Sequence, residues 1–225
     1  MFVPHRFTNL AAHRDIKVTI SSFIILRGIS LEVPDGGLVG LIGRNGAGKS
    51  TTLKSVMGIV SLSSGGIEFD GQDLLSVPAH QRAHLGIGYM PEDRRLIGSL
   101  TVRDNIMMPA WAANLDDAEK RLDYVYGLMP ELLPFENRRA SMLSGGQQKM
   151  AALGRALMRG TKILLLDEPF EGLSPGLGIK LAETIQQLAR DGLTILIVES
   201  DLKRIGFVKT NYVIERGENV DEPAG

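Results

Sequence analysis

Gly43-Arg44-Asn45-Gly46-Ala47-Gly48-Lys49-Ser50-Thr51 is the stretch that decides the fold. It fits the phosphate-loop pattern G-x-x-x-x-G-K-[ST] at every fixed position. A short apolar run at 38–42 precedes it, and residues 51–57 read as the first turns of a helix. Strand, loop and helix in this order are the context that the motif requires, so the sequence predicts an α/β fold.

The residue types in this loop suit a polyphosphate. Glycines let the backbone N–H groups turn inward without Cβ clashes, and the helix N-terminus adds partial positive charge. We expect Lys49 to reach the β and γ phosphates and the Ser50 hydroxyl to bind Mg²⁺. The alternative is a Gly-rich turn that binds nothing, which would make four matching positions and both flanking elements accidental.

The bulk properties narrow the class of protein. At 225 residues with 44% hydrophobic residues, the chain can form one large or two small globular domains. It contains neither a run of about 18 apolar residues nor a secretory apolar stretch, so we expect it in the cytoplasm unless a partner holds it elsewhere. Zero cysteines exclude disulfides. A net charge of −1 argues against non-specific nucleic-acid binding as the main activity.

The region before the phosphate loop reads as β structure. Residues 1–14 show no periodicity and are expected to form a loose arm. Residues 15–20 and 24–33 are β-branched and partly alternating, and Pro34-Asp35-Gly36-Gly37 is a strong turn signal. We therefore predict an antiparallel hairpin that leads into the strand at 38–42.

His80 and His84 form a candidate metal site separate from the Mg²⁺ site expected at the phosphate loop. They are four residues apart and would share a face of the helix expected at about 78–85. No third histidine, cysteine or paired carboxylate accompanies them, so the structural interpretation is favoured and no metal beyond Mg²⁺ is assigned.

The second half of the chain predicts a helical region and then parallel strands. A mostly helical region is expected from about 100 to 159, and Ser144 is a plausible N-cap within it. Continuous apolar runs at 163–166 and 195–198 suit parallel strands covered on both faces. A helix between them would complete a right-handed βαβ unit. Residues 212–215 are expected to form the last strand.

Asp167 and Glu168 follow the first of these apolar runs, at the end of the strand where an open α/β sheet binds its ligand. A carboxylate there can hold Mg²⁺ through water, and its neighbour can orient water for in-line attack on a γ phosphate. Alone, such a pair is often only a helix-capping turn. The phosphate loop upstream favours the catalytic interpretation.

Three motifs make the sequence resemble the ATP-binding-cassette (ABC) family, from about residue 15 to 217. Residues 43–51 resemble the Walker A loop, and 163–168 resemble Walker B with its following glutamate. Leu143-Ser144-Gly145-Gly146-Gln147-Gln148 resembles the LSGGQ signature, which lies some 20 residues before Walker B and separates this family from kinases and GTPases.

The resemblance implies a P-loop NTPase core, which is a mainly parallel sheet with flanking helices, and an antiparallel β hairpin region. It implies one ABC ATPase domain at 15–217 with a helical subdomain inserted at about 93–158. The N-terminal arm would then be 1–14 and the C-terminal tail 218–225.

The same resemblance implies ATP and Mg²⁺ as cofactors, and as partners a second ABC ATPase subunit and a transmembrane permease. Two cassettes would enclose ATP head to tail, so Ser144, Gly145 and Gly146 are expected to act on the ATP of the facing cassette. The subunit would be cytoplasmic and peripheral on the inner face of the cell membrane, touching it only through the permease.

Short connecting segments are similar to the ATPase subunits of branched-chain amino-acid and urea importers. These segments are residues 89–95, 100–106, 168–175 and 198–199. Two alternatives stay open: a weakly hydrolysing or degenerate half of a hetero-oligomeric pair, and a soluble cassette protein unconnected with transport.

Several positions depart from the family pattern. Glu92 stands where a glutamine usually offers an amide, Ser174 where an aspartate is common, and Ser200 where a switch histidine contacts the γ phosphate. Ile20 occupies the usual adenine-stacking position, with Phe23 the nearest aromatic residue. Glu92 can offer oxygen to Mg²⁺, whereas Ser200 can donate a hydrogen bond but has no positive charge.

The sequence therefore gives two sets of candidate residues beside the phosphate loop and the signature. The candidate catalytic residues are Glu168, Glu92 and Ser200, and the candidate Mg²⁺ ligands are Ser50, Asp167 and Glu92.

Overall fold

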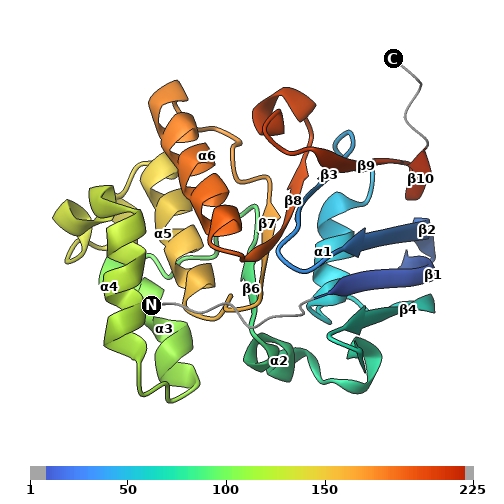
Figure 1. The fold of residues 1–225 in the computed structure, drawn as a ribbon, viewed down its shortest axis with the longest axis horizontal. Coiled ribbons are helices and arrows are strands. Elements are labelled where there is room, and N and C mark those ends of the chain that lie inside the picture. The colour runs from blue at the N-terminus through green and yellow to red at the C-terminus, as the bar shows by residue number, and fades with distance from the viewer. Residues whose placement is uncertain (1–8, 221–225) are drawn as a thin grey trace.

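A computed structural model describes residues 9–220 of the chain (Figure 1). The strands are β1 Leu10–Ile20, β2 Phe23–Val33, β3 Leu38–Ile42, β4 Ser64–Phe69, β5 Gln72–Asp73, β6 Ile87–Met90, β7 Ile163–Asp167, β8 Thr194–Glu199, β9 Thr210–Glu215 and β10 Glu218–Val220. The α-helices are α1 Lys49–Val56, α2 Ala79–Arg82, α3 Val102–Ala112, α4 Ala118–Leu128, α5 Gly145–Leu157 and α6 Pro175–Arg190. Within residues 9–220, no helix is both long and apolar enough to cross a membrane.

The strands form one sheet in the order β5-β4-β1-β2-β10-β9-β3-β8-β7-β6. The five strands from β9 to β6 are parallel, and β1 pairs antiparallel with both β2 and β4. The predicted parallel core and the predicted antiparallel hairpin are both present. The helix between β7 and β8 is α6, as the βαβ pattern predicts.

Strands β7 and β8 are covered on both faces, which explains their continuous apolar sequence. In β7, Leu164 and Leu166 belong to a core cluster with residues of α3, α4, α5 and α6. Ile163 and Leu165 point the other way, into a second cluster that includes Leu53 of α1. Figure 1 shows α5 and α6 on one side of these strands and α1 on the other.

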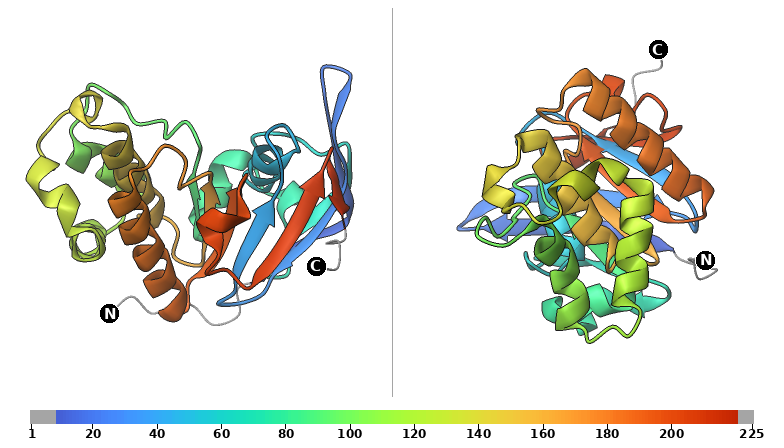
Figure 2. Two further views of the ribbon diagram at one scale, coloured as in Figure 1. Left: turned by 90° about the horizontal axis from the view of Figure 1, so that it is seen from above. Right: turned by 90° about the vertical axis from the view of Figure 1, so that its left-hand side faces the viewer.

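Helices α3, α4 and α5 lie between β6 and β7 in the chain, where the sequence predicts a helical insertion. Figure 2 shows them grouped at one end of the molecule, with the β1–β2 hairpin at the other. Thr101 caps the start of α3 by accepting a hydrogen bond from the Asp104 amide at 3.0 Å. The fully buried Asn105 ties this helix to the preceding loop through the backbone N–H and C=O of Ile97.

The N-terminal boundary differs from the prediction. Strand β1 begins at Leu10, so the expectation of a loose arm at 1–14 is wrong for residues 10–14; residues 1–8 lie outside the described part. Leu10 is fully buried and pairs with Val33 of β2 and with Phe69 of β4. The missed strand is stabilised by pairing with two partners distant in the sequence.

The C-terminal boundary also differs. Residues 218–220 of the predicted tail form β10, so β9 is not the last strand; residues 221–225 lie outside the described part. Arg216 and Gly217 both have positive φ, 50° and 84°, which is the geometry of a tight hairpin turn. Strand β10 pairs antiparallel with β9 and parallel with β2 at Gly28.

Candidate functional site

The phosphate loop joins β3 to α1 and depends on glycine at three positions. Gly46 and Gly48 have φ values of 82° and 109°, which favour glycine. A Cβ at Gly48 would lie 2.5 Å from Leu26, and one at Gly43 would lie 2.4 Å from the carbonyl oxygen of Ile214. Beside Gly46 the space is open, as a loop that binds a ligand at its tip requires.

Lys49 is the buried cation of this loop. Its side chain is 5% exposed, and its ammonium donates hydrogen bonds to the carbonyl oxygens of Gly43 at 2.8 Å and Arg44 at 3.3 Å. The same Nζ is 3.0 Å from Oε1 of Glu168. The predicted phosphate-binding residue and the predicted water-orienting residue are therefore in direct contact.

Ser50 and Asp167 meet as the predicted Mg²⁺ site requires. The Ser50 hydroxyl donates a hydrogen bond of 2.8 Å to Oδ1 of Asp167, and the Tyr89 hydroxyl donates one of 3.4 Å to Oδ2. Burial raises the pKa of Asp167, although the bond from Ser50 works in the opposite direction. Hydroxyl and carboxylate oxygens are the ligands that Mg²⁺ prefers, so this donor set fits the ion.

Glu168 is held by Ser200. Both the backbone N–H and the hydroxyl of Ser200 donate to Oε2 of Glu168, at 3.2 and 3.1 Å. Burial acts to raise the pKa of Glu168, but hydrogen bonds from Glu199 and Lys49 outweigh it, and the pKa lies below its usual range. The Glu168 carboxylate is thus held by two hydrogen bonds from Ser200, the residue that stands at the switch position by sequence resemblance.

A second buried carboxylate, Glu199, was not among the predicted site residues. Its Oε1 accepts a hydrogen bond from the Phe170 amide at 2.9 Å, and its Oε2 lies 3.2 Å from the guanidinium of Arg204. Burial and the neighbouring Glu168 raise the pKa of Glu199 to about 7. The sequence contained a pattern that could have identified Glu199 as a site residue. It ends an apolar strand at the same edge of the sheet as Asp167.

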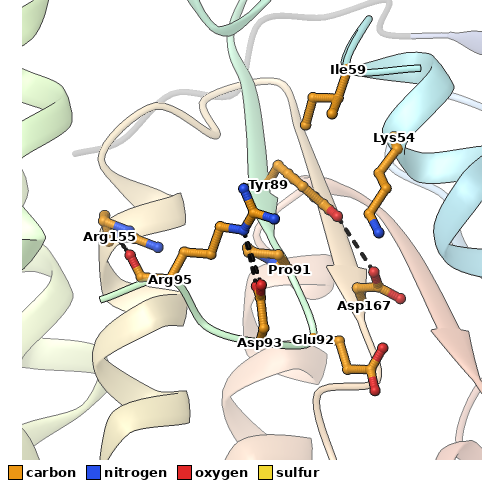
Figure 3. A pocket seen from close by; sticks show the side chains of 9 residues that line it. All are labelled: Lys54, Ile59, Tyr89, Pro91, Glu92, Asp93, Arg95, Arg155 and Asp167. Atoms are coloured by element: carbon orange, nitrogen blue, oxygen red, sulfur yellow. Dashed lines mark hydrogen bonds and ion pairs between the residues drawn. The ribbon is translucent and has the colours of Figure 1, made fainter. Parts of the chain in front are cut away.

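Glu92 lies near Asp167, as its candidacy as a metal ligand requires. Both side chains line a cavity of about 310 Å³, together with Lys54, Tyr89 and Arg155 (Figure 3). The exposed Glu92 adds negative charge that contributes to the raised pKa of Asp167.

The signature residues are placed apart from this group. Ser144 caps α5 in a capping box with Gln147: its hydroxyl accepts from the Gln147 amide at 3.3 Å, and its own amide donates to Gln147 Oε1 at 2.9 Å. Ser144 and Gly145 are exposed, while Gly146 is buried. Helices α5 and α1 lie on opposite sides of β7 in Figure 1, and among the described residues no hydrogen bond or ion pair joins Ser144, Gly145 or Gly146 to the phosphate loop.

Two further sequence candidates lie on the surface. At the tip of the β1–β2 hairpin, Ile20 is 43% and Phe23 is 73% exposed. His80 and His84 are both exposed, and residues 9–220 contain no cluster of three or more His, Cys, Asp or Glu suited to a metal ion.

Comparison with known proteins identifies the family. A family model described as ABC transporter matches residues 26–171. The chain belongs to the ABC transporter family. The cassette is 39% identical over 201 residues to BraG of Pseudomonas aeruginosa, a high-affinity branched-chain amino acid transport ATP-binding protein, covering 89% of this chain and 86% of BraG. It is 37% identical over 197 residues to LptB of Escherichia coli K12, a lipopolysaccharide export ATP-binding protein, covering 86% of this chain and 81% of LptB.

Solved structures agree on the fold. The ADP conformation of MJ1267, an ATP-binding cassette of an ABC transporter, is 27% identical with a TM-score of 0.81, over 95% of this chain and 89% of MJ1267. The dimeric, ADP- and Pi-bound cassette MJ0796 is 24% identical with a TM-score of 0.84, over 94% of this chain and 97% of MJ0796. The predicted P-loop NTPase fold is confirmed. The chain is the ATP-binding subunit of an ABC transporter and an ATPase.

Proposed function

We propose that this cassette energises a membrane importer for branched-chain amino acids, urea or a related small polar solute. The observation that carries the proposal is the 39% identity with BraG over most of both chains. LptB, from an export system, is 37% identical, so export is the competing direction of transport.

In this proposal the amides of the phosphate loop and the ammonium of Lys49 bind the phosphates of ATP, with all residues from Gly43 to Thr51 contributing to the loop. Ser50 and Asp167 would hold Mg²⁺, and Glu92 would supply a further oxygen. The 2.8 Å contact between Ser50 and Asp167 supports this pairing. Mg²⁺ supplies positive charge that offsets the charge of the phosphates.

Glu168 polarises the attacking water, and Ser200 fixes the direction of its carboxylate. Lys49 is shared between two tasks, because its ammonium is paired with Glu168 at 3.0 Å and is also the cation for phosphate. When phosphate binds, the Lys49 ammonium would contact the phosphate instead of Glu168. The Glu168 carboxylate would then accept hydrogen bonds from Ser200 and from water.

Two cassettes would act head to tail. The exposed Ser144 and Gly145, with Gly146 behind them, would contact the ATP of the facing cassette. The membrane contact would be made by a separate permease, reached through the helical segment at about 93–140, which places the subunit on the inner face of the membrane. Purified cassette is then expected not to float with protein-free liposomes at physiological salt.

The test is purification of the tagged cassette from native membranes, with identification of the copurifying permease. Uptake of labelled leucine and of urea is then measured in cells lacking the gene and complemented with wild type or Glu168→Gln. Restoration of uptake by wild type alone supports the proposal. The importer proposal would be wrong if the deletion strain takes up both solutes at the wild-type rate and the copurifying partner is a lipopolysaccharide-export permease. The cassette would then be assigned to export.

A further inference from the structure

Lys149 lies in α5, the helix that begins with the signature, and is almost completely buried. The residue is 4% exposed, and its ammonium donates a hydrogen bond of 2.5 Å to the backbone carbonyl oxygen of Glu168. We propose that Lys149 is a positioning residue that fixes the backbone of Glu168 to the signature helix of the same chain. The inference rests on the proposed role of Glu168.

Burial of this ammonium has no simple packing explanation. Taking a charged group out of water is unfavourable unless a partner compensates it. Burial lowers the pKa of Lys149, and nearby carboxylates, that of Glu171 foremost, act in the opposite direction. Among the described residues none of these carboxylates forms a salt bridge with its ammonium. Methionine would fill the same space without that cost, so the specific contact with the Glu168 carbonyl is the feature that lysine adds.

The contact acts on a strained residue. Glu168 has a φ of 47°, a left-handed conformation that is unfavourable for a residue other than glycine. Its amide donates to the Val198 carbonyl at 3.0 Å, and its carbonyl also accepts from the Glu171 amide at 3.3 Å. The bond from Lys149 therefore restrains the peptide that follows Glu168, and with it the direction in which the carboxylate leaves the backbone.

The link also joins two parts of the molecule. Glu168 directly follows β7 of the parallel sheet, whereas Lys149 is held by the packing of α5 against α3 and β6. A displacement of the signature helix would pull on the backbone of Glu168. This connection lies within one chain, so it would operate in addition to any contact across a cassette pair.

The experiment uses Lys149→Met in the full chain. We expect kcat for ATP to fall about tenfold or more, with KM within about twofold, because orientation of the carboxylate and not nucleotide binding is lost. The Tm of the nucleotide-free protein should change little, because the loss of one hydrogen bond and of the attraction to nearby carboxylates opposes the gain from removing a buried charge. Hydrogen exchange of a peptide spanning 168–171 in the same nucleotide-free protein should become faster, while a peptide of β8 keeps its rate.

Lys162→Met is the matched control. Lys162 donates to Asp70, away from the candidate site, so its loss should change neither kcat nor exchange at 168–171. Lys149→Gln retains a hydrogen-bond donor without the charge and should recover part of the kcat and part of the exchange protection.

Wild-type kcat and wild-type exchange in Lys149→Met would overturn the proposal. If Lys149→Met lowers Tm, the proposal is judged on Lys149→Gln instead. A fall in the kcat of Lys149→Gln without faster hydrogen exchange at 168–171 would count against the positioning role of the Lys149 bond to Glu168. Glu168→Gln, assayed in parallel, separates the proposed catalytic role of Glu168 from the proposed positioning role of Lys149. Undiminished turnover in Glu168→Gln refutes the role of Glu168, whereas the exchange result tests the Lys149 contact independently.

Discussion

At the scale of single residues, Lys49 and Glu168 form a buried ion pair whose two members are expected to serve different steps. Their side chains are 5% and 7% exposed, so removal of either leaves the other with a buried charge that has lost a partner. One residue is expected to serve binding and the other turnover.

We predict that Lys49→Ala weakens nucleotide binding, whereas Glu168→Gln binds ATP and Mg²⁺ normally and hydrolyses ATP at least about 100-fold more slowly. Fluorescent-nucleotide titration and steady-state ATPase assays measure the two effects. Equal ATPase rates for Glu168→Gln and wild type would remove Glu168 from the mechanism.

Glu199 predicts a pH dependence of stability. Its pKa of about 7 exceeds the ordinary value of 4.5, so the folded state keeps a proton that the unfolded state loses. The resulting stabilisation is complete below pH 4.5 and is lost as the pH rises through 7. Glutamine cannot ionise, so the stability of Glu199→Gln relative to wild type should increase by about 3 kcal/mol over this range.

Urea unfolding of nucleotide-free protein between pH 4.5 and 7.5 measures this difference. Glu183→Gln, at an exposed position of α6, is the control and should follow the wild-type profile. A stability difference that does not vary with pH would mean that Glu199 is ionised in the folded state throughout.

At the scale of elements, α3 and α5 offer a matched pair of helix starts. Thr101 caps α3 and Ser144 caps α5, each through a side-chain oxygen that accepts from the amide three residues later. Replacement of either by alanine should cost about 1 kcal/mol of stability. Only Ser144→Ala should also lower the ATPase rate of the assembled cassette pair, because only that cap belongs to the signature. An equal loss of activity in both variants, tracking Tm, would assign Ser144 a purely structural role.

The elements also show what could be predicted from sequence. The phosphate loop, the parallel strands β7 and β8 and helix α6 follow from local patterns, and the structure contains them. The first residues of β1 and the whole of β10 were missed because their stability comes from pairing with strands distant in the chain. Lys149 and Glu199 were missed for a related reason, since burial and a neighbour from another segment give each its chemistry.

At the scale of the whole molecule, the question is whether one chain makes an efficient site. Ser200 brings no positive charge to a region that already contains Glu92 and Glu168. Arg204 lies 3.8 Å from Glu168 but is also paired with Glu199. A second cassette with a switch histidine would provide a better site, to which this chain would contribute Ser144, Gly145 and Gly146.

We therefore expect slow ATPase activity from the isolated cassette and faster activity in a complex with a histidine-containing cassette. The turnover of wild type, of Ser200→His and of the assembled transporter gives the comparison. If isolated wild type already matches the complex and Ser200→His changes nothing, the site is competent as it stands and the asymmetric pair should be abandoned.

The position of β10 has a practical consequence for anyone who shortens or tags this protein. This short strand lies between β2 and β9, so it connects the antiparallel hairpin to the parallel strands within one sheet. Deletion from Arg216 onward would leave unpaired backbone groups along β9 and at Arg27 and Gly28 of β2, which invite pairing with another molecule. We expect the truncated chain to aggregate in size-exclusion chromatography while deletion of 221–225 does not. If both shortened chains elute as monomers, β10 is not needed to keep β2 and β9 from pairing with another molecule.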